Sequence, residues 1–292
     1  STMWTQVQSA IAGAERIFEL LEEEPGVLDP PHTRLLNVTA GRVELDHVTF
    51  AYEPQTSLLR SVSLTAEPGQ TVALVGPTGA GKTTLISLLE RFYDVQEGSV
   101  TIDGQDVRAV TQDSLRQSIG IVLQDTFLFA DTIRQNIRYG RPDANDAAVE
   151  SAALRARAHE FISQLPEGYE TILQEGAVNL SRGQRQLLAI ARALLKDPSI
   201  LVLDEATSNV DTRTELMIQE GLAELLKERT SFVIAHRLST VQRADVIYVI
   251  EMGQITEHGT HDDLIQLNGT YSRIYSSQFE QRIIDKASTN SD

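Results

Sequence analysis

Apolar residues recur along the chain with two different periods, one typical of strands and one typical of helices. Short apolar or alternating runs predict β-strands at 43–50, 58–66, 71–75, 99–102, 119–123, 200–203, 231–235, 246–250 and 254–256. Longer segments with helical spacing or without helix breakers predict α-helices at 3–24, 85–89, 147–158, 183–195 and 212–227. Because strands and helices alternate through most of the chain, the pattern predicts an α/β fold.

The first predicted helix has one apolar face, formed by residues spaced alternately four and three apart: Val7, Ile11, Ala14, Phe18 and Leu21. It ends at Pro25-Gly26, and the proline-containing stretch 25–40 that follows predicts a linker. The helix is either an ordinary packing element or the end of a larger structure upstream of Ser1. We expect the main domain at 41–280 and a polar tail at 281–292.

A second segment departs from the alternation of strands and helices. Between about 125 and 195 the chain carries no clear strand and is mostly helical in pattern. This segment lies between two predicted strands, so we expect a helical insertion into the sheet domain.

The stretch with the clearest chemistry is Gly76-Pro77-Thr78-Gly79-Ala80-Gly81-Lys82-Thr83. It has the spacing of a phosphate-binding loop and lies between a predicted strand and a predicted helix. Glycines permit positive φ angles, so successive backbone N–H groups can face one anion at the start of the helix. Lys82 would add a charge for the β- and γ-phosphates, and the Thr83 hydroxyl would ligate Mg²⁺. The alternative is a glycine turn with an exposed lysine.

Polar residues follow three other predicted strands, each of the buried type, at the point where the strand ends: Gln124 after 119–123, Asp204 with Glu205 after 200–203, and His236 after 231–235. Ligands bind at the carboxyl edge of open α/β sheets. Asp204 would lie beside the metal, and Glu205 would act as a general base on water. Gln124 could contact Mg²⁺, the attacking water or a moving neighbour, and His236 a γ-phosphate. Taken singly, each residue could also be structural.

Two further positions could contact a nucleotide. Tyr52 precedes the phosphate loop and could stack on adenine, although its position alone favours a surface or core tyrosine. Ser181, in Leu180-Ser181-Arg182-Gly183-Gln184, is a natural N-cap for the helix that follows. With Gly183 and the basic Arg185 nearby, this helix start could also bind a phosphate.

Composition and charge narrow the possible functions. With 292 residues, of which 41% are hydrophobic and 23% charged, the chain can bury a large core. It has no cysteine, which excludes disulfides, thiol catalysis and Cys-ligated zinc. A formal net charge of −16 argues against nucleic acid or an anionic lipid surface as the main partner. The sequence contains no run of 18 apolar residues that would predict a membrane span.

Together these residues resemble the nucleotide-binding domain of ATP-binding cassette (ABC) transporters, from about Gly41 to Phe279. The motifs keep the family's order: Tyr52 as the A-loop, Gly76 to Thr83 as Walker A, Gln124 as the Q-loop, Leu180 to Gln184 as the signature, Ile200 to Asp204 as Walker B with Glu205 as the catalytic glutamate, Ser208 to Asp211 as the D-loop and His236 as the switch histidine. The segments 12–18, 124–129 and 136–137 are similar to exporters whose membrane and nucleotide domains share one chain.

The resemblance implies a P-loop NTPase core with a RecA-like, mostly parallel sheet, an antiparallel β subdomain and an inserted α-helical subdomain. It also implies an ATPase that requires Mg²⁺ and powers export from the cytoplasmic face of a membrane. The residues expected to contact ATP are Tyr52, Gly76, Pro77, Thr78, Gly79, Ala80, Gly81, Lys82, Thr83, Thr84, Ser181, Gly183 and Gln184. Those expected at Mg²⁺ are Thr83, Gln124 and Asp204, and those expected in catalysis are Glu205, His236 and Gln124.

The resemblance implies partners as well. Two cassettes, identical or not, would pair head to tail, so that Ser181 and Gly183 serve the γ-phosphate held by the other chain. The helix at 1–24 would continue from a transmembrane domain of the same polypeptide, which would make this chain the cytosolic end of a half-transporter. Closure of the pair would move the membrane domains, with Gln124 and its loop passing on the change, and hydrolysis would reset them.

Two residues depart from the family pattern. Arg182 stands where the signature usually has glycine, and Ala177 stands where a second glycine after Gly176 is common. Because the phosphate contacts are expected from Ser181 and Gly183, Arg182 should be tolerated, but it could alter ATP affinity or mark pairing with a non-identical chain. Glu205 and His236 are both present, which argues against a degenerate site.

Two rival functions fit part of the sequence. A soluble ABC ATPase of DNA repair or translation would carry a long coiled-coil insertion or a second cassette, and this sequence has neither. A P-loop kinase would leave the signature unexplained.

Overall fold

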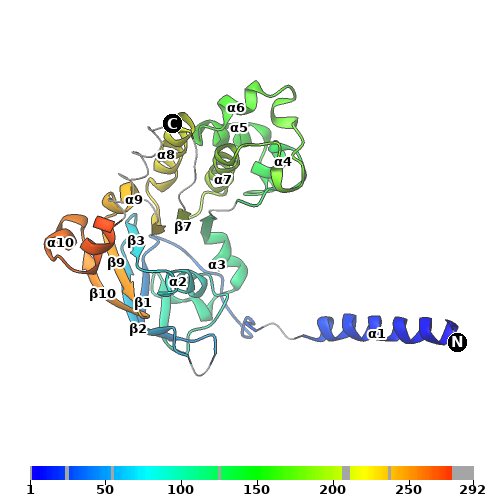
Figure 1. The fold of residues 1–292 in the computed structure, drawn as a ribbon, viewed down its shortest axis with the longest axis horizontal. Coiled ribbons are helices and arrows are strands. Elements are labelled where there is room, and N and C mark those ends of the chain that lie inside the picture. The colour runs from blue at the N-terminus through cyan, green and yellow to red at the C-terminus, as the bar shows by residue number, and fades with distance from the viewer. Residues whose placement is uncertain are drawn as a thin grey trace.

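The computed structural model describes residues 2–23, 26–53, 56–123, 126–205, 211–235 and 238–277, without the side chains of Glu205, Ala235, Leu238 and Ser239. Helices and strands alternate through most of the chain, as the sequence predicts (Figure 1). The elements, with η marking 3₁₀ turns, are α1 (Thr2–Glu22), β1 (Val43–Phe50), β2 (Leu59–Ala66), β3 (Thr71–Val75), α2 (Lys82–Leu89), β4 (Glu97–Ile102), β5 (Gln105–Asp106), η1 (Val107–Ala109), α3 (Gln112–Ser118), β6 (Ile119–Val122), α4 (Ile133–Arg138), α5 (Asp146–Arg155), α6 (His159–Gln164), η2 (Gly168–Glu170), η3 (Glu175–Ala177), α7 (Arg182–Lys196), β7 (Ile200–Glu205), α8 (Thr212–Leu226), β8 (Thr230–Ala235), α9 (Leu238–Gln242), β9 (Val246–Glu251), β10 (Gln254–Gly259) and α10 (His261–Gln266).

The central sheet has six strands in the order β10-β9-β3-β8-β7-β6. The five strands from β9 to β6 are parallel to their neighbours, and β10 pairs antiparallel with β9. Parallel neighbours point their carboxyl ends to the same edge, so the C-terminal ends of β3, β7 and β8 lie on one side of the domain. The mostly parallel core that the resemblance implies is therefore confirmed.

The two faces of this sheet are covered by two separate hydrophobic cores. Along β3, Ala73 and Val75 belong to one core, whereas Val72 and Leu74 belong to the other. This alternation follows from the two-residue period of a strand, which sends successive side chains to opposite faces. The first core contains residues of α7 and α8, and the second contains residues of α2 and α3. A strand covered on both faces needs a continuous apolar sequence, which explains the run at 71–75.

A second, smaller sheet forms the antiparallel subdomain. Its four strands have the order β2-β1-β4-β5 and pair antiparallel throughout. Its buried residues share the second core with α2, so this sheet packs on the same side of the central sheet as the helix that follows the phosphate loop.

The helical insertion lies between β6 and β7. It contains α4, α5, α6 and α7 with two short 3₁₀ turns, and α7 packs against both α4 and α5. These helices form a separate lobe in Figure 1. The inserted α-helical subdomain is therefore confirmed.

The strand β6 differs from its prediction. We predicted a buried strand at 119–123, but Ile121 and Leu123 are 42% and 53% exposed. The reason is position, because β6 pairs with β7 on one side and is the last strand of the sheet in the described part of the chain. An apolar run in the sequence does not by itself show whether a strand lies in the centre or at the edge of a sheet.

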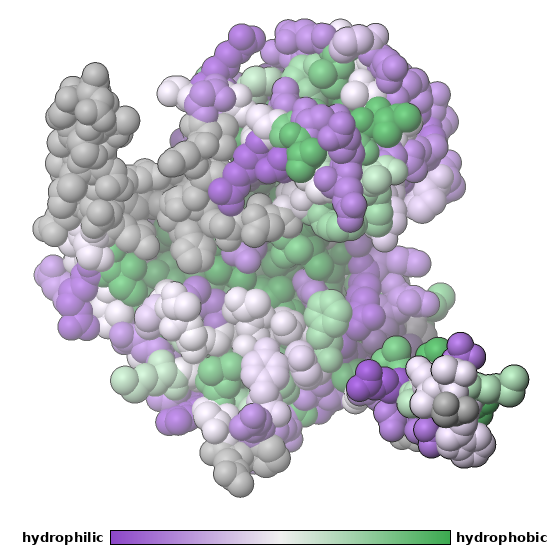
Figure 2. All heavy atoms as spheres, turned by 45° about the vertical axis from the view of Figure 1, so that its right-hand side comes forward, coloured by the Kyte–Doolittle hydropathy of each residue, from purple (hydrophilic) through white to green (hydrophobic). Residues whose placement is uncertain are grey.

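The helix α1 extends away from the rest of the structure (Figure 1). The structure describes all of its residues, and none of them is buried. Its apolar side chains therefore lie on the surface, and they include Val7, Ile11, Phe18 and Leu21. Figure 2 shows green spheres in the part of the molecule that stands apart from the main body. No helix within the described ranges is both long and apolar enough to span a membrane.

Candidate nucleotide-binding site

The phosphate loop connects β3 to α2, and glycine is favoured at three of its positions by close packing, by a positive φ or by both. A Cβ atom on Gly76 would lie 2.1 Å from the carbonyl oxygen of Ile250, and one on Gly81 would lie 2.5 Å from Cδ2 of Leu59. Gly79 has no such neighbour in the described structure, but its φ of 81° lies in the left-handed region. Any other residue at these positions would therefore strain the loop.

Lys82 begins α2 and turns its side chain back over the loop. Its Nζ donates hydrogen bonds to the carbonyl oxygens of Gly76 at 2.7 Å and Pro77 at 2.9 Å. Burial lowers the pKa of Lys82, and the carboxylate of Asp204 opposes that shift. The ammonium group is thus held at the loop by two neutral acceptors, which a phosphate could replace with a stronger, charge-assisted partner.

A cavity of about 270 Å³ lies over the loop. Its wall combines loop residues with side chains from the ends of neighbouring strands: Leu58, Thr78, Gly79, Gly81, Lys82, Thr83, Thr84, Asp204 and Ile234. Asp204 comes from β7 and pairs in register with Ile234 of β8, which places it at the carboxyl edge of the sheet. The structure thus brings together seven of the predicted site residues.

The donor set of this cavity fits Mg²⁺ bound with a nucleotide. The exposed Thr83 and the Asp204 carboxylate would supply oxygen ligands, which Mg²⁺ prefers. Among the residues that the structure describes, no group of three or more His, Cys, Asp or Glu side chains could hold a metal. A nucleotide site needs none, because Mg²⁺ is usually bound by one or two carboxylates together with substrate phosphates.

Tyr52 lies beside α2, the helix that follows the phosphate loop. Its hydroxyl is 3.2 Å from Oγ1 of Thr84, a residue of the cavity wall. Its ring packs edge to face against Phe50 and Tyr93, with centroid distances of 5.0 and 5.1 Å. Half of Tyr52 is exposed, so the ring has a free surface on which a base could stack.

Three residues of this region were missed from the sequence. Leu58 and Ile234 line the cavity, and Tyr93 supports the ring of Tyr52. Leu58 and Ile234 belong to predicted strands, so their positions at the cavity depend on sheet order. Tyr93 follows the phosphate-loop helix, and nothing in its local pattern indicates a contact with Tyr52.

The segment at 180–184 lies elsewhere in the structure. Ser181 is the N-cap of α7, its Oγ accepts from the Gln184 backbone N–H at 3.2 Å, and the Gln184 side chain accepts from the Ser181 N–H at 2.9 Å. The predicted cap is therefore confirmed, as a full capping box. In the described structure Ser181, Gly183 and Gln184 are not part of the cavity wall. A contact of these residues with phosphate remains a prediction.

Several predicted residues cannot be placed. Gln124, Ser208 and His236 lie outside the described residues, and the side chain of Glu205 is likewise not described. The backbone of Glu205 ends β7 and pairs with Ala235 of β8. Asp211 is the N-cap of α8, where its Oδ1 accepts from the Thr214 N–H at 3.0 Å.

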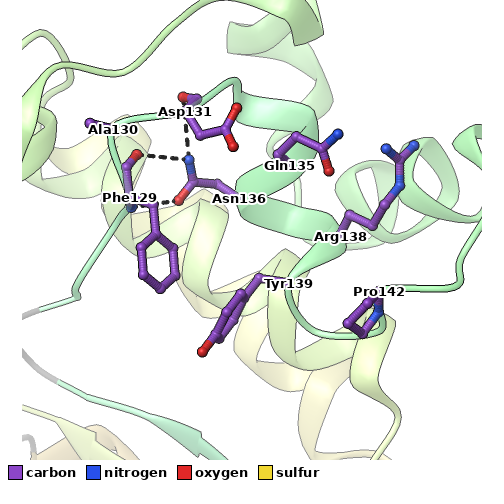
Figure 3. A pocket seen from close by; sticks show the side chains of 8 residues that line it. All are labelled: Phe129, Ala130, Asp131, Gln135, Asn136, Arg138, Tyr139 and Pro142. Carbon is purple, nitrogen blue, oxygen red and sulfur yellow. Dashed lines mark hydrogen bonds between the residues drawn. The ribbon is translucent and has the colours of Figure 1, made fainter.

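A second hollow, of about 420 Å³, lies on the helical lobe beside α4 (Figure 3). The rings of Phe129 and Tyr139 lie 4.7 Å apart at its wall, and the side chain of Asn136 holds the loop by hydrogen bonds to both the N–H and the carbonyl of Phe129. Phe127 and Tyr139 are largely exposed. An exposed aromatic group of this kind is typical of a surface that binds another protein segment.

Comparison with known proteins gives the same assignment as the geometry. The family model described as "ABC transporter" matches residues 59–208, about half of the chain. A solved structure of a bacterial Atm1-family ABC exporter with ATP bound superposes with a TM-score of 0.86 at 42% identity, over 94% of this chain and 48% of that chain.

Curated relatives agree. The chain is 52% identical over 269 residues to the fatty acid ABC transporter ATP-binding/permease protein of Mycobacterium bovis, covering 92% of this chain and 42% of that protein. It is 46% identical over 275 residues to the ATP-dependent lipid A-core flippase of Syntrophus aciditrophicus, covering 94% of this chain and 46% of that protein. The chain thus spans less than half the length of these relatives. Its fold, its loop and these matches show that the chain belongs to the ABC transporter family, as an ATP-binding domain.

Proposed function

We propose that this domain hydrolyses ATP and powers export across a membrane, as the cytoplasmic part of a longer transporter. The observation that carries the proposal is the cavity over the phosphate loop, where Lys82, Thr83 and Asp204 meet at the carboxyl edge of the sheet. The named relatives include a flippase and an exporter, which supports transport out of the cytoplasm as the direction.

Binding of ATP would use groups that are already in place. The loop 76–83 would direct its backbone N–H groups at the phosphates, and Lys82 would exchange its two carbonyl partners for phosphate oxygens. Tyr52 would stack on the adenine. Mg²⁺, held by Thr83, Asp204 and Gln124, would offset the charge of the phosphates.

Hydrolysis would use the ends of two neighbouring strands. Glu205 would orient a water molecule and remove its proton, because it ends β7 directly after Asp204. Glu205 pairs with Ala235 of β8, and His236 follows Ala235 in the chain, so we expect both side chains at the same edge of the sheet. His236 would contact the γ-phosphate, and Gln124 would contact Mg²⁺ or the attacking water.

A second chain would complete the site. Ser181 and Gly183 are not in the wall of the described cavity, which agrees with a role for them at the γ-phosphate held by another chain. Head-to-tail pairing of two cassettes would place them there.

The membrane domain would contact the aromatic hollow of Figure 3. Phe129 and Tyr139 line this hollow, and the exposed Phe127 packs on Phe129. Because these residues follow Gln124 in the chain, the surface could pass changes at the nucleotide to the membrane domain. The helix α1, with its exposed apolar side chains, would continue from the last membrane helix.

Replacing Lys82 by alanine tests the binding part of the proposal. We expect Lys82→Ala to raise the dissociation constant of ATP at least about tenfold, since a charge-assisted bond to phosphate contributes about 1.5–3 kcal/mol. Lys227→Ala is the matched control, because Lys227 is an exposed lysine at the C-terminal end of α8. Titration of both variants with ATP measures the two dissociation constants. Equal affinity in the two variants would refute the assignment of the loop.

Replacing Glu205 by glutamine tests the catalytic part. We expect Glu205→Gln to keep ATP binding but to lower phosphate release by about 10²- to 10⁴-fold, the usual contribution of positioned acid–base catalysis. Glu167→Gln, at an exposed glutamate, should leave turnover unchanged. Near-normal turnover in Glu205→Gln would remove Glu205 from this role. Sizing of the same variant with and without ATP and Mg²⁺ tests the pairing, since persistent monomers would contradict it.

A further inference from the structure

The residues after α1 are bound to the domain along much of their length. Here 26–42 is called the strap. The Arg34 N–H donates to the carbonyl of Ala109 at 3.3 Å, and the Thr111 N–H donates to the carbonyl of Arg34 at 2.9 Å. The Leu36 N–H donates to the Ser114 side chain at 2.8 Å. The stretch predicted as a linker is therefore held against the surface formed by 103–114.

The strap is also held at its C-terminal end by one carboxylate. Asp103 accepts hydrogen bonds from four successive backbone N–H groups, those of residues 39–42, at 2.8–3.1 Å. Burial alone would raise the pKa of Asp103, but the four N–H groups lower it to about 2. The carboxylate is thus ionised and bound throughout the neutral range.

At its N-terminal end the strap contacts the far end of the phosphate-loop helix. Asp29 accepts from Nη1 of Arg91 at 3.1 Å, and the carbonyl of Leu28 accepts from Nη2 of Arg91 at 3.1 Å. The same Asp29 carboxylate accepts from the Gln112 N–H at 3.1 Å, at the start of α3. Two neighbouring residues of the strap are therefore joined to one guanidinium group.

Arg91 is a fully buried cation, with 1% of its side chain exposed. Besides its bonds to the strap, its Nε donates to Asp94 at 3.0 Å and its Nη1 to the carbonyl of Val110 at 3.1 Å. Every nitrogen of the guanidinium group is thus engaged. A buried charge requires such partners, and removing one of them leaves a charge without compensation.

The backbone of Arg91 provides independent support. It follows α2 after the C-cap Glu90, and its φ of 54° is left-handed. Helices commonly end on a left-handed residue at this position, but that residue is usually glycine, because other side chains are strained there. Arginine at this position indicates that the contacts of its side chain outweigh the strain.

The helix α2 connects this contact to the nucleotide site. It has eight residues, from Lys82 to Leu89, so it is about 12 Å long at 1.5 Å per residue. Most of its residues are buried in the core, which makes it a rigid connection. On the other side, three residues lie between Glu22, the last residue of α1, and Gly26, the first residue of the strap, so α1 ends within about 14 Å of the strap.

We propose that Asp29 and Arg91 are positioning residues that tie the strap to the far end of α2, so that ATP binding at the phosphate loop restrains the strap and α1. This rests on the proposed function, in which the cavity binds ATP. The tie runs through α2 and the strap, and it is separate from the aromatic hollow beside α4. The nucleotide site would then act on α1 directly along the chain.

The first test compares two carboxylates that share Arg91. Asp29→Asn removes the carboxylate charge by which the strap contacts Arg91. Asp94→Asn removes a similarly exposed carboxylate charge that also contacts Arg91 but does not belong to the strap. Hydrogen exchange of the strap amides is measured with and without ATP and Mg²⁺. We expect ATP to slow this exchange at least about threefold in the parent and in Asp94→Asn, and to have little effect in Asp29→Asn. Asp29→Glu should restore the response.

Two outcomes of this experiment would overturn the proposal. One is an equal loss of the response in Asp29→Asn and Asp94→Asn, which would mean that Arg91 only supports the fold. The other is a parent that binds ATP without any change in the strap. ATP binding is titrated in the same samples, so a parent that fails to bind ATP would instead contradict the proposed function.

A second test needs no nucleotide. Because the chain has no cysteine, spin labels can be attached to Ser9→Cys in α1 and Gln254→Cys on β10 without background. We expect the distribution of distances between the labels to be broader in Asp29→Asn than in the parent or in Asp94→Asn. Identical distributions in all three proteins would refute the tie, whatever the result with ATP.

Discussion

Gly76 and Gly79 lie in the same loop, yet the same substitution by alanine should have very different costs. At Gly79 a Cβ atom would meet no atom within 4 Å in the described structure, so the cost is that of a side chain at φ 81°. That cost is about 1–2 kcal/mol. At Gly76 the new Cβ would lie 2.1 Å from the carbonyl oxygen of Ile250. This oxygen belongs to the backbone and cannot move by a change of rotamer.

The cost at Gly76 follows from what must move. Ile250 lies in β9, and the neighbouring Val249 pairs with Val75, directly before Gly76. To relieve the contact, β9 must separate from the end of β3, although it is also held by β10. Losing two hydrogen bonds of the ladder costs about 2 kcal/mol in addition to the backbone strain, so Gly76→Ala should cost about 3–4 kcal/mol. This is a large part of a typical domain's stability.

Urea unfolding of the parent and both variants measures this difference. We expect the free energy of unfolding to fall about 2 kcal/mol further in Gly76→Ala than in Gly79→Ala, with an unchanged dependence on urea concentration. If the two variants unfold within about 0.5 kcal/mol of each other, the end of β9 yields easily and the packing argument for Gly76 is wrong.

Two other predictions concern single side chains. Asp103→Asn should destabilise the domain by about 1 kcal/mol at pH 7, after allowance for the exposure of this carboxylate. Because the folded pKa of about 2 is lower than the ordinary 3.8, this contribution is complete above about pH 4 and is lost as the pH falls towards 2, so unfolding curves of the two proteins should converge on acidification. Ala177 is buried at φ 49°, so Ala177→Gly should change stability by less than about 0.5 kcal/mol, since relief of strain offsets the lost methyl contact. Ala158→Gly, equally buried at φ −81°, should cost about 1 kcal/mol in the same urea assay, and equal losses at the two positions would contradict the role of φ.

The phosphate loop could be predicted from the sequence because its constraint is local. The glycines, Lys82 and Thr83 are consecutive, and the strand and helix on either side are recognisable from their own residues. The position of Asp204 could also be inferred, since a carboxylate after a buried parallel strand must reach the edge of the sheet. Both predictions needed only the order of residues within one element.

Other features depend on pairs that lie far apart in the chain. Arg91 and Asp29 are separated by 62 residues, and each has an ordinary local context. The exposure of Ile121 depends on which strand lies at the edge of the sheet. In the same way, a tyrosine after α2 gives no sign that Tyr93 will pack on Tyr52. These contacts are set by tertiary packing, which local patterns do not encode.

The position of Ser181 bears on how the site is completed. A serine N-cap with Gln184 as its partner is fully accounted for by the capping box, so the cap alone explains both residues. It does not explain Gly183, which is buried in the first turn of α7, where alanine would favour the helix by about 1 kcal/mol. A glycine there lets another group approach the backbone closely, as Gly76 and Gly81 do in the phosphate loop. In the described structure Gly183 is buried and is not part of this chain's cavity wall, so its contact with the γ-phosphate of a second chain remains a prediction.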